Sequence, residues 1–305
     1  MKPPILVTGA HRSGTTWVGR MLCAGGGVRY VQEPFNAGVS GPTWLRERVP
    51  YWYYYATAAD KERLRGQLED LLAGRYPVVA GMSRIRKPRH VARLCRDFSV
   101  GMLSRLQQRR TLLKDPLALF SAEWLSDEFG MQVIVMIRRP VAFVSSLKHL
   151  GWGFDFRGWV SQPILMEELL APYSAEIEYM VEEKRGLVDQ AILLWNILYS
   201  IVCQYRNIHS DWTFVEHEPL ARDPLTGFQR LYEKCGLGWS PRARQRILAH
   251  SNAYQGRSLD YKPGEIRRNS SATLKTWRER LSDDEIERVR RGTASVASKL
   301  YATEG

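Results

Sequence analysis

Short apolar runs separated by longer amphipathic segments form the dominant pattern of this 305-residue chain. The runs are rich in Val, Ile and Leu and predict buried strands, while the segments between them predict helices. Such alternation favours right-handed crossovers and a parallel arrangement of strands. The sequence therefore predicts a three-layer α/β fold with a mostly parallel central sheet, whose strands lie near residues 5–9, 28–32, 77–80, 110–114, 132–137 and 212–216.

Two helix-rich segments, residues 44–75 and 151–211, have no place in this sheet and are predicted insertions that form the wall or lid of a ligand pocket. They are unusually aromatic, with Trp44, the run 50–55, Trp152 and Trp159 among their rings. Flat rings stack on sugars and apolar ligands, although core packing explains them equally well. No repeat or low-complexity linker divides the chain, so a single domain over residues 1–305 is expected.

The first apolar run, residues 5–9, leads into a turn rich in Gly, Ser and Thr that opens a helix. Backbone N–H groups at such a turn, with the positive end of the helix dipole, bind phosphate-like anions. Gly9 and Gly14 have the spacing of an ATP or GTP loop, but Thr15 stands where that loop carries its Lys. Arg12 supplies the cation instead. The turn therefore suits a nucleotide phosphate better than a metal-bound triphosphate.

Three other strand ends carry charged side chains. Residues 132–137 are followed by Arg138, and Ser146 lies eight positions further on. Lys114 ends the strand at 110–114, and Glu33 follows the strand at 28–32. Ligands of open α/β sheets bind beyond the carboxyl ends of the strands, so these residues and Arg12 are expected to converge there.

Residues 12–17, Arg-Ser-Gly-Thr-Thr-Trp, resemble the 5′-phosphosulfate loop of the sulfotransferases that use 3′-phosphoadenosine 5′-phosphosulfate (PAPS). Arg138 and Ser146 have the spacing of the family's 3′-phosphate contacts, and Lys114 resembles its catalytic Lys. Pro116 stands where the cytosolic phenol and steroid enzymes carry a catalytic His. That departure points to the carbohydrate, heparan-type and bacterial branch, where a Glu after the second strand is the base.

Later segments continue the resemblance in the family's order. Residues 212–224 are similar to its strand followed by a Tyr-Glu-Asp-Leu segment, with His217 in place of the common Tyr. Residues 276–286 look like its terminal Trp-Arg motif and last helix. The resemblance thus runs from residue 5 to about residue 290.

The resemblance implies in-line transfer of a sulfuryl group to an acceptor hydroxyl, leaving 3′-phosphoadenosine 5′-phosphate, with no metal. The catalytic residues implied are Glu33 as base, Arg12 and Lys114; His11, beside the loop, is the rival base. The residues expected to bind PAPS are Arg12, Ser13, Gly14, Thr15, Thr16, Trp17, Arg138, Ser146, Arg267 and Ser271. The preferred acceptor is a carbohydrate or glycolipid, with a small alcohol or an aromatic natural product left open.

The formal net charge is +12, concentrated in clusters such as residues 84–90 and 242–246. Nucleic acid or an acidic membrane would account for this charge, but so would a multiply charged nucleotide. No RNA-binding signature or zinc spacing accompanies it, so nucleic acid is not the expected partner, and peripheral membrane contact stays open. The cluster at 242–246 is interpreted as a solvated face.

The four Cys residues form no C-x-x-C pair, which favours a reduced setting. Residues 187–205 come nearest to a membrane span, but polar positions interrupt them and they are interpreted as a buried helix. No signal peptide is apparent, and a cytoplasmic enzyme is expected. The oligomeric state cannot be inferred from the sequence.

Two other classes compete with this interpretation. A P-loop kinase or nucleotide-binding regulatory protein would use a similar turn, although it would need the missing Lys and a Mg²⁺-binding carboxylate. A non-enzymatic binder of anionic polymers would need only the basic patches.

Overall fold

The computed structural model describes residues 2–183, 185–251 and 276–301. Five strands form a sheet in the order β2-β3-β1-β4-β5, and the pairs β2–β3, β1–β3 and β4–β5 are parallel. The predicted α/β class with a mostly parallel sheet is therefore confirmed. The chain divides into two compact units, residues 1–8 with 26–133 and residues 9–25 with 134–305.

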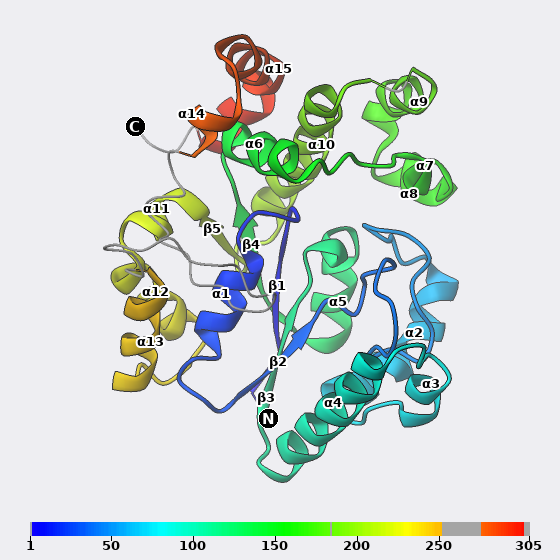
Figure 1. The fold of residues 1–305 in the computed structure, drawn as a ribbon, viewed down its shortest axis with the longest axis vertical. Coiled ribbons are helices and arrows are strands. Elements are labelled where there is room, and N and C mark those ends of the chain that lie inside the picture. The colour runs from blue at the N-terminus through cyan, green and yellow to red at the C-terminus, as the bar shows by residue number, and fades with distance from the viewer. Residues whose placement is uncertain (1, 184, 252–275, 302–305) are drawn as a thin grey trace. The chain divides into compact units, whose positions relative to one another are not determined.

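The first unit holds three strands and the helices that follow them (Figure 1). In β2–β3 the register pairs Gln32 with Lys114, and in β1–β3 it pairs Val7 with the same Lys. Because Gln32 is opposite Lys114, the residues that follow these two leave β2 and β3 at the same level of the sheet. The elements are β1 (Ile5–Gly9, whose last residue belongs to the second unit), β2 (Val28–Gln32), α2 (Ala58–Leu72), α3 (Val78–Met82), α4 (Pro88–Leu106), β3 (Arg110–Lys114), the 3-10 helix η1 (Pro116–Ser121) and α5 (Ala122–Phe129).

The second unit begins with the loop after β1 and contains most of the helices. Within it, α6, α10 and α15 lie side by side, as Figure 1 shows. The elements are α1 (Thr15–Leu22), β4 (Gln132–Ile137, which starts in the first unit), α6 (Pro140–Leu150), α7 (Arg157–Val160), α8 (Pro163–Glu168), η2 (Ala171–Tyr173), α9 (Ser174–Glu182), α10 (Leu187–Ile208), β5 (Thr213–Glu216), α11 (His217–Arg222), α12 (Pro224–Lys234), α13 (Pro241–Ser251), α14 (Trp277–Arg280) and α15 (Asp283–Tyr301).

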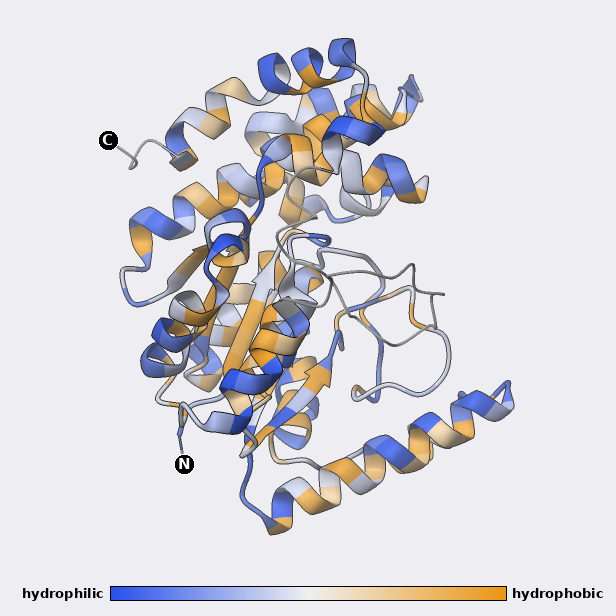
Figure 2. Cartoon of the chain, turned by 60° about the vertical axis from the view of Figure 1, so that its left-hand side comes forward, coloured by the Kyte–Doolittle hydropathy of each residue, from blue (hydrophilic) through white to orange (hydrophobic). Residues whose placement is uncertain are grey.

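The strands carry the hydrophobic core, and Figure 2 shows them among the most apolar parts of the chain. All of β1 is buried, as are five of the six residues of β4. Central strands of parallel sheets are covered on both faces, which is why these segments read as continuous apolar runs. The predicted bounds of the first two strands, β3 and β4 match the observed ones, and β5 begins one residue later than expected.

The strand predicted near residues 77–80 is instead the short helix α3. Its N–H groups find local partners: Gly81 donates to the Pro77 carbonyl at 2.8 Å and Ser83 to that of Val79 at 3.1 Å. Gly81 lets the helix approach α4, since a Cβ there would lie 2.9 Å from Leu94. The pair Val78-Val79 misled the prediction, because β-branched residues raise strand propensity only weakly against such tertiary contacts.

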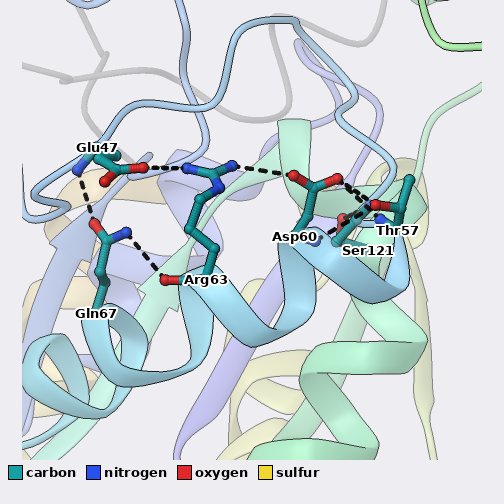
Figure 3. A network of polar contacts seen from close by, with 7 residues as sticks. Glu47, Thr57, Asp60, Arg63, Gln67 and Ser121 are labelled. Atoms are coloured by element: carbon teal, nitrogen blue, oxygen red, sulfur yellow. Dashed lines mark hydrogen bonds and ion pairs between the residues drawn. The ribbon is translucent and has the colours of Figure 1, made fainter.

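A polar network anchors the segment before α2, within the first predicted insertion (Figure 3). Thr57 and Asp60 form a capping box at the start of the helix. Arg63 joins Asp60 to Glu47, and the Glu47 N–H donates to Gln67 at 2.8 Å. The loop that follows β2 is thereby fixed to one face of α2.

In the second insertion, α10 is long and apolar enough to cross a membrane by length and composition. Its buried residues include Trp195 and Tyr199, and it packs against both α6 and α15. The prediction of a largely buried helix is confirmed. Part of this insertion thus supports the sheet, a role that the lid interpretation did not include.

Candidate functional site

The loop between β1 and α1 has the backbone of an anion cradle. Gly9 and Gly14 have φ of 130° and 101°, and Arg12 lies in the left-handed region at 67°. A Cβ on Gly9 would lie 2.5 Å from the Met136 carbonyl oxygen of β4, so only Gly fits there. The loop then enters α1 through Gly14 with no side-chain cap, which leaves the first N–H groups of the helix available to a ligand.

Side chains of the loop reinforce this geometry. Ser13 is fully buried, and its Oγ has no hydrogen-bond partner among the described residues. A buried hydroxyl without a partner is costly in a folded protein, and beside the free N–H groups at the start of α1 this one is available to a ligand. Thr15 is buried and Thr16 is half-buried at the start of α1.

Arg12, Arg138 and Ser146 meet in the second unit, as the sequence predicts. Arg12 Nε donates to Ser146 Oγ at 3.2 Å, and the Arg138 guanidinium donates to the Arg12 carbonyl. Two guanidinium groups and a hydroxyl therefore gather beside the loop. Bidentate, charge-assisted bonds from Arg are the common way in which proteins hold phosphate.

The main chain of Arg138 is fixed by α10. Its N–H donates to Tyr199 Oη and its carbonyl accepts from Trp195 Nε1, both at 2.9 Å. Arg139 turns the other way, with its guanidinium 5.4 Å from the Tyr301 ring centre and its N–H donating to Glu218 at 3.1 Å. Arg138 therefore faces the loop, whereas Arg139 faces Tyr301.

Glu33 and Lys114 form an ion pair in the first unit. The Lys114 side chain is fully buried, whereas that of Glu33 is 20% exposed. The Glu33 N–H donates to the Lys114 carbonyl at 2.8 Å, and Asn36 Nδ2 donates to Glu33 Oε2 at 2.9 Å. Glu33 has a φ of 46°, an unusual conformation for a residue with a side chain. Strained backbone of this kind gathers at functional sites.

Asp115, the residue after Lys114, has a buried carboxyl group that is bound by main-chain N–H groups. It accepts from the N–H groups of Phe35 at 2.6 Å and Leu117 at 3.0 Å. Burial and the charge of Glu33 raise the pKa of Asp115 to about 7. Asp115 therefore holds the turns after β2 and β3, and Glu33 is the ion-pair partner of Lys114.

His11, the rival base, lies in an apolar site. Its ring is 5.8 Å from that of Phe143 and 6.4 Å from that of Phe154. Burial, with a smaller contribution from the Arg12 charge, lowers the pKa of His11 to about 3. The imidazole is thus neutral and enclosed by rings, which favours a packing role.

Three aromatic residues singled out in the sequence have different surroundings. Trp17 packs edge-on against His217 and Phe228, with ring centres 5.7 and 5.1 Å apart. Trp159 is fully buried against Phe156, so it belongs to the core and cannot stack on a ligand. Trp152 is exposed and lies 5.6 Å from the Arg12 guanidinium.

Sequence reasoning missed the contact of His217 with the loop. A Cβ on Gly14 would lie 2.5 Å from His217 Nδ1, so this ring limits the size of the residue at position 14. The roles of Tyr199 and Trp195 in fixing Arg138 were also missed. The signal for His217 was its replacement of the family's Tyr in the segment after β5. Arg267 and Ser271 lie outside the described residues.

The sequence model described as the sulfotransferase family matches residues 3–241. The chain belongs to the sulfotransferase family. Sulfuryl transfer is therefore its general reaction class. No curated protein is similar enough in sequence to match this sulfotransferase.

Solved structures with the same kind of fold are distant. They include the sulfotransferase domain from the curacin biosynthetic pathway, at 14% identity and a TM-score of 0.47, covering 96% of this sulfotransferase and 98% of that chain. The sulfotransferase domain of the Synechococcus PCC 7002 olefin synthase has 16% identity and a TM-score of 0.43, with 95% of each chain covered. Similarities this weak do not identify the acceptor or the cofactor of this sulfotransferase.

Proposed function

We propose that this protein transfers the sulfuryl group of PAPS to a hydroxyl of a carbohydrate or glycolipid acceptor, with Glu33 as the base. The observation that carries the donor assignment is the meeting of Arg12, Arg138 and Ser146 beside a loop with Thr15 in place of the nucleotide-loop Lys. Two separate anionic groups on one nucleotide match two sets of donors, the loop N–H groups and this cluster.

The Ser13 hydroxyl, which has no partner in the described part of the chain, and the uncapped start of α1 fit the 5′-phosphosulfate. Arg138 and Ser146 fit the 3′-phosphate, with Arg12 between the two groups. PAPS supplies an activated sulfuryl group on a good leaving group. Removing Arg12 is expected to cost about 2–4 kcal/mol of transition-state stabilisation, the effect of one preorganised donor.

Glu33 supports the base assignment because it is a partly exposed carboxylate at the end of a strand, oriented on both oxygens by Lys114 and Asn36. In the proposed step the acceptor oxygen bonds to sulfur and gives its proton to Glu33, while the sulfur–oxygen bond to the nucleotide breaks. In this proposal Lys114 balances the charge that develops on the leaving phosphate oxygen.

Exposed Trp152, near Arg12, supports the acceptor class, since indole rings stack on sugar faces. The Glu-based branch that the sequence resembles adds to this choice. A labelled sulfate recovered only on a simple phenol, with none on glycans or glycolipids, would contradict the acceptor assignment while leaving the donor assignment intact.

The donor assignment is tested by thermal unfolding in the presence of nucleotides without metal. We expect 3′-phosphoadenosine 5′-phosphate to raise the unfolding temperature of the wild type and to leave that of Arg12→Ala unchanged. Arg20→Ala, at the other end of α1, is the matched control and should respond as the wild type does. Stabilisation by ATP with Mg²⁺, and none by 3′-phosphoadenosine 5′-phosphate, would favour the kinase class instead.

A further inference from the structure

Helix α4 is amphipathic in the reverse of the usual sense, because most of its large apolar side chains face solvent whereas its buried residues are polar or small. Its buried residues are His90, Asp97, Gly101 and Ser104, all polar or small. The large apolar side chains that it exposes are Val91, Phe98, Met102, Leu103 and Leu106, at 45, 43, 49, 47 and 74%. Figure 2 shows apolar and polar segments alternating along this helix.

The buried face of α4 already has its partners within the same unit. A Cβ on Gly101 would lie 2.6 Å from the Gly74 carbonyl oxygen, and a Cβ on Gly41 would lie 2.8 Å from the His90 ring. The helix is thus seated on the loops before and after α2. Its outward face has no such neighbour among the described residues.

The outward apolar residues form one continuous surface. At 3.6 residues per turn, these side chains project from α4 within an arc of about 140° around the helix axis. Phe98 and Leu103 lie at the two edges of the arc, and Leu106 lies near its middle. On α3, which packs against α4, Val79 and Met82 are also 83 and 60% exposed. Seven of the thirteen large apolar side chains exposed in the described part of the chain lie on these two helices. Concentrated exposure of this kind marks an interaction site.

The surroundings of this surface are strongly basic. Nine Lys or Arg residues and a single acidic residue, Asp97, lie between Arg84 and Arg110. Arg89 and Arg96 border one edge of the apolar arc and Arg105 borders the other, and all three are exposed. An apolar stripe between rows of Arg is the composition of helices that lie in the plane of an anionic membrane.

From this arrangement we propose that the outward face of α3 and α4 docks on an anionic lipid bilayer, with α4 parallel to the surface and its apolar arc in the headgroup region. A second copy of the chain fits the face poorly, since a two-fold contact would bring one basic segment against its duplicate. An anionic lipid surface satisfies both the apolar arc and the Arg rows. The proposal does not depend on the sulfuryl donor.

Flotation with lipid vesicles tests the proposal. We expect the full chain to float with phosphatidylcholine vesicles that contain phosphatidylglycerol, to stay behind with phosphatidylcholine alone, and to be released by high salt. Met102→Ser/Leu106→Ser should weaken binding about tenfold or more. Arg89→Gln/Arg105→Gln should weaken it roughly fivefold for each charge removed.

The matched control is Ile208→Ser, which removes an equally exposed apolar side chain, 67% exposed, from the end of α10. It should float as the wild type does. Light scattering of the same proteins reports their oligomeric state. The proposal is overturned if the wild type does not float with anionic vesicles, or if Met102→Ser/Leu106→Ser floats as the wild type does. A wild-type dimer that this variant converts to monomers, without vesicle binding, assigns the face to a second copy instead.

Discussion

Arg12 and Ser146, 134 residues apart in the sequence, are joined by a 3.2 Å hydrogen bond between the loop that follows β1 and α6. The Arg138 guanidinium reaches the carbonyl of the same Arg12. The position of the loop cation is therefore coupled to both residues assigned to the 3′-phosphate. Loss of either one should affect nucleotide binding as well as loop geometry.

Ser146→Ala should weaken the binding of 3′-phosphoadenosine 5′-phosphate about tenfold, because a hydroxyl that bonds a charged group is lost. Isothermal titration calorimetry measures the change. Ser145→Ala is the matched control, since Ser145 is also buried on α6 but its Oγ has no partner among the described residues. Equal losses for the two variants would show that α6, rather than the Ser146 hydroxyl, was disturbed.

Glu33→Gln should abolish most sulfuryl transfer while leaving nucleotide affinity nearly unchanged. It should also lower the free energy of unfolding by up to about 3 kcal/mol, because it leaves the buried Lys114 without its counter-charge. The double variant Glu33→Gln/Lys114→Met should recover stability but not turnover. Glu62→Gln, on the exposed surface of α2, serves as control, and full activity in Glu33→Gln would refute the base role.

His11→Asn should leave the acid limb of the pH–rate profile where it is in the wild type. The reason is that burial lowers the pKa of His11 to about 3, so the ring stays neutral above that range. Its replacement should instead lower the unfolding temperature, because Phe143 and Phe154 lose a packing partner. A profile whose acid limb moves in His11→Asn would return this residue to the list of bases.

Asp115 should make the protein less stable as the pH rises from about 4 to about 7. Its folded-state pKa is raised to about 7, whereas an unfolded Asp titrates near 3.9. The folded state therefore binds a proton that the unfolded state has lost, and stability falls through this window by an amount on the order of 4 kcal/mol, at about 1.36 kcal/mol per pKa unit. Denaturant unfolding at several pH values should show this slope removed in Asp115→Asn and kept in Asp127→Asn, an exposed control on α5.

Gly14→Ala should lower the free energy of unfolding by about 1–3 kcal/mol through backbone strain, with a further loss from the clash with His217. Adding His217→Ala should recover the part of the free energy of unfolding that is lost through the clash, but not the part lost through backbone strain. Gly26→Ala separates the two effects, since Gly26 has a φ of 88° but nothing within 4 Å of its Cβ position. If the second substitution recovers nothing, the ring does not limit position 14.

The sequence predicts the strands well because each is a buried apolar run, and their order along the chain places Arg12, Glu33, Lys114 and Arg138 at strand ends. It fails at residues 77–80, where contacts with α4 outweigh the strand propensity of Val78-Val79. Which side chains bond to one another is harder to predict than which strand ends carry them. The partner of Lys114 depends on a register in which Gln32 faces it and Glu33 follows, and no local pattern separates that from a bond to Asp115.

The support of Arg138 depends equally on distant packing. Trp195 and Tyr199 look like ordinary core residues of an apolar helix, and only the folded chain directs their polar atoms to the strand end. The same holds for His217, whose contact with Gly14 joins the two sequence segments that make up the second unit.

Because α10 grips position 138 through its amide and carbonyl, the side chain there can be exchanged without loosening the strand. Position 138 is therefore suited to redesign, because a shorter or neutral side chain there would leave the main-chain hydrogen bonds to α10 unchanged. Under the proposed role of Arg138 in binding the 3′-phosphate, substitutions at this position should favour donors that lack this group, while α10 keeps the main chain of the strand end in place.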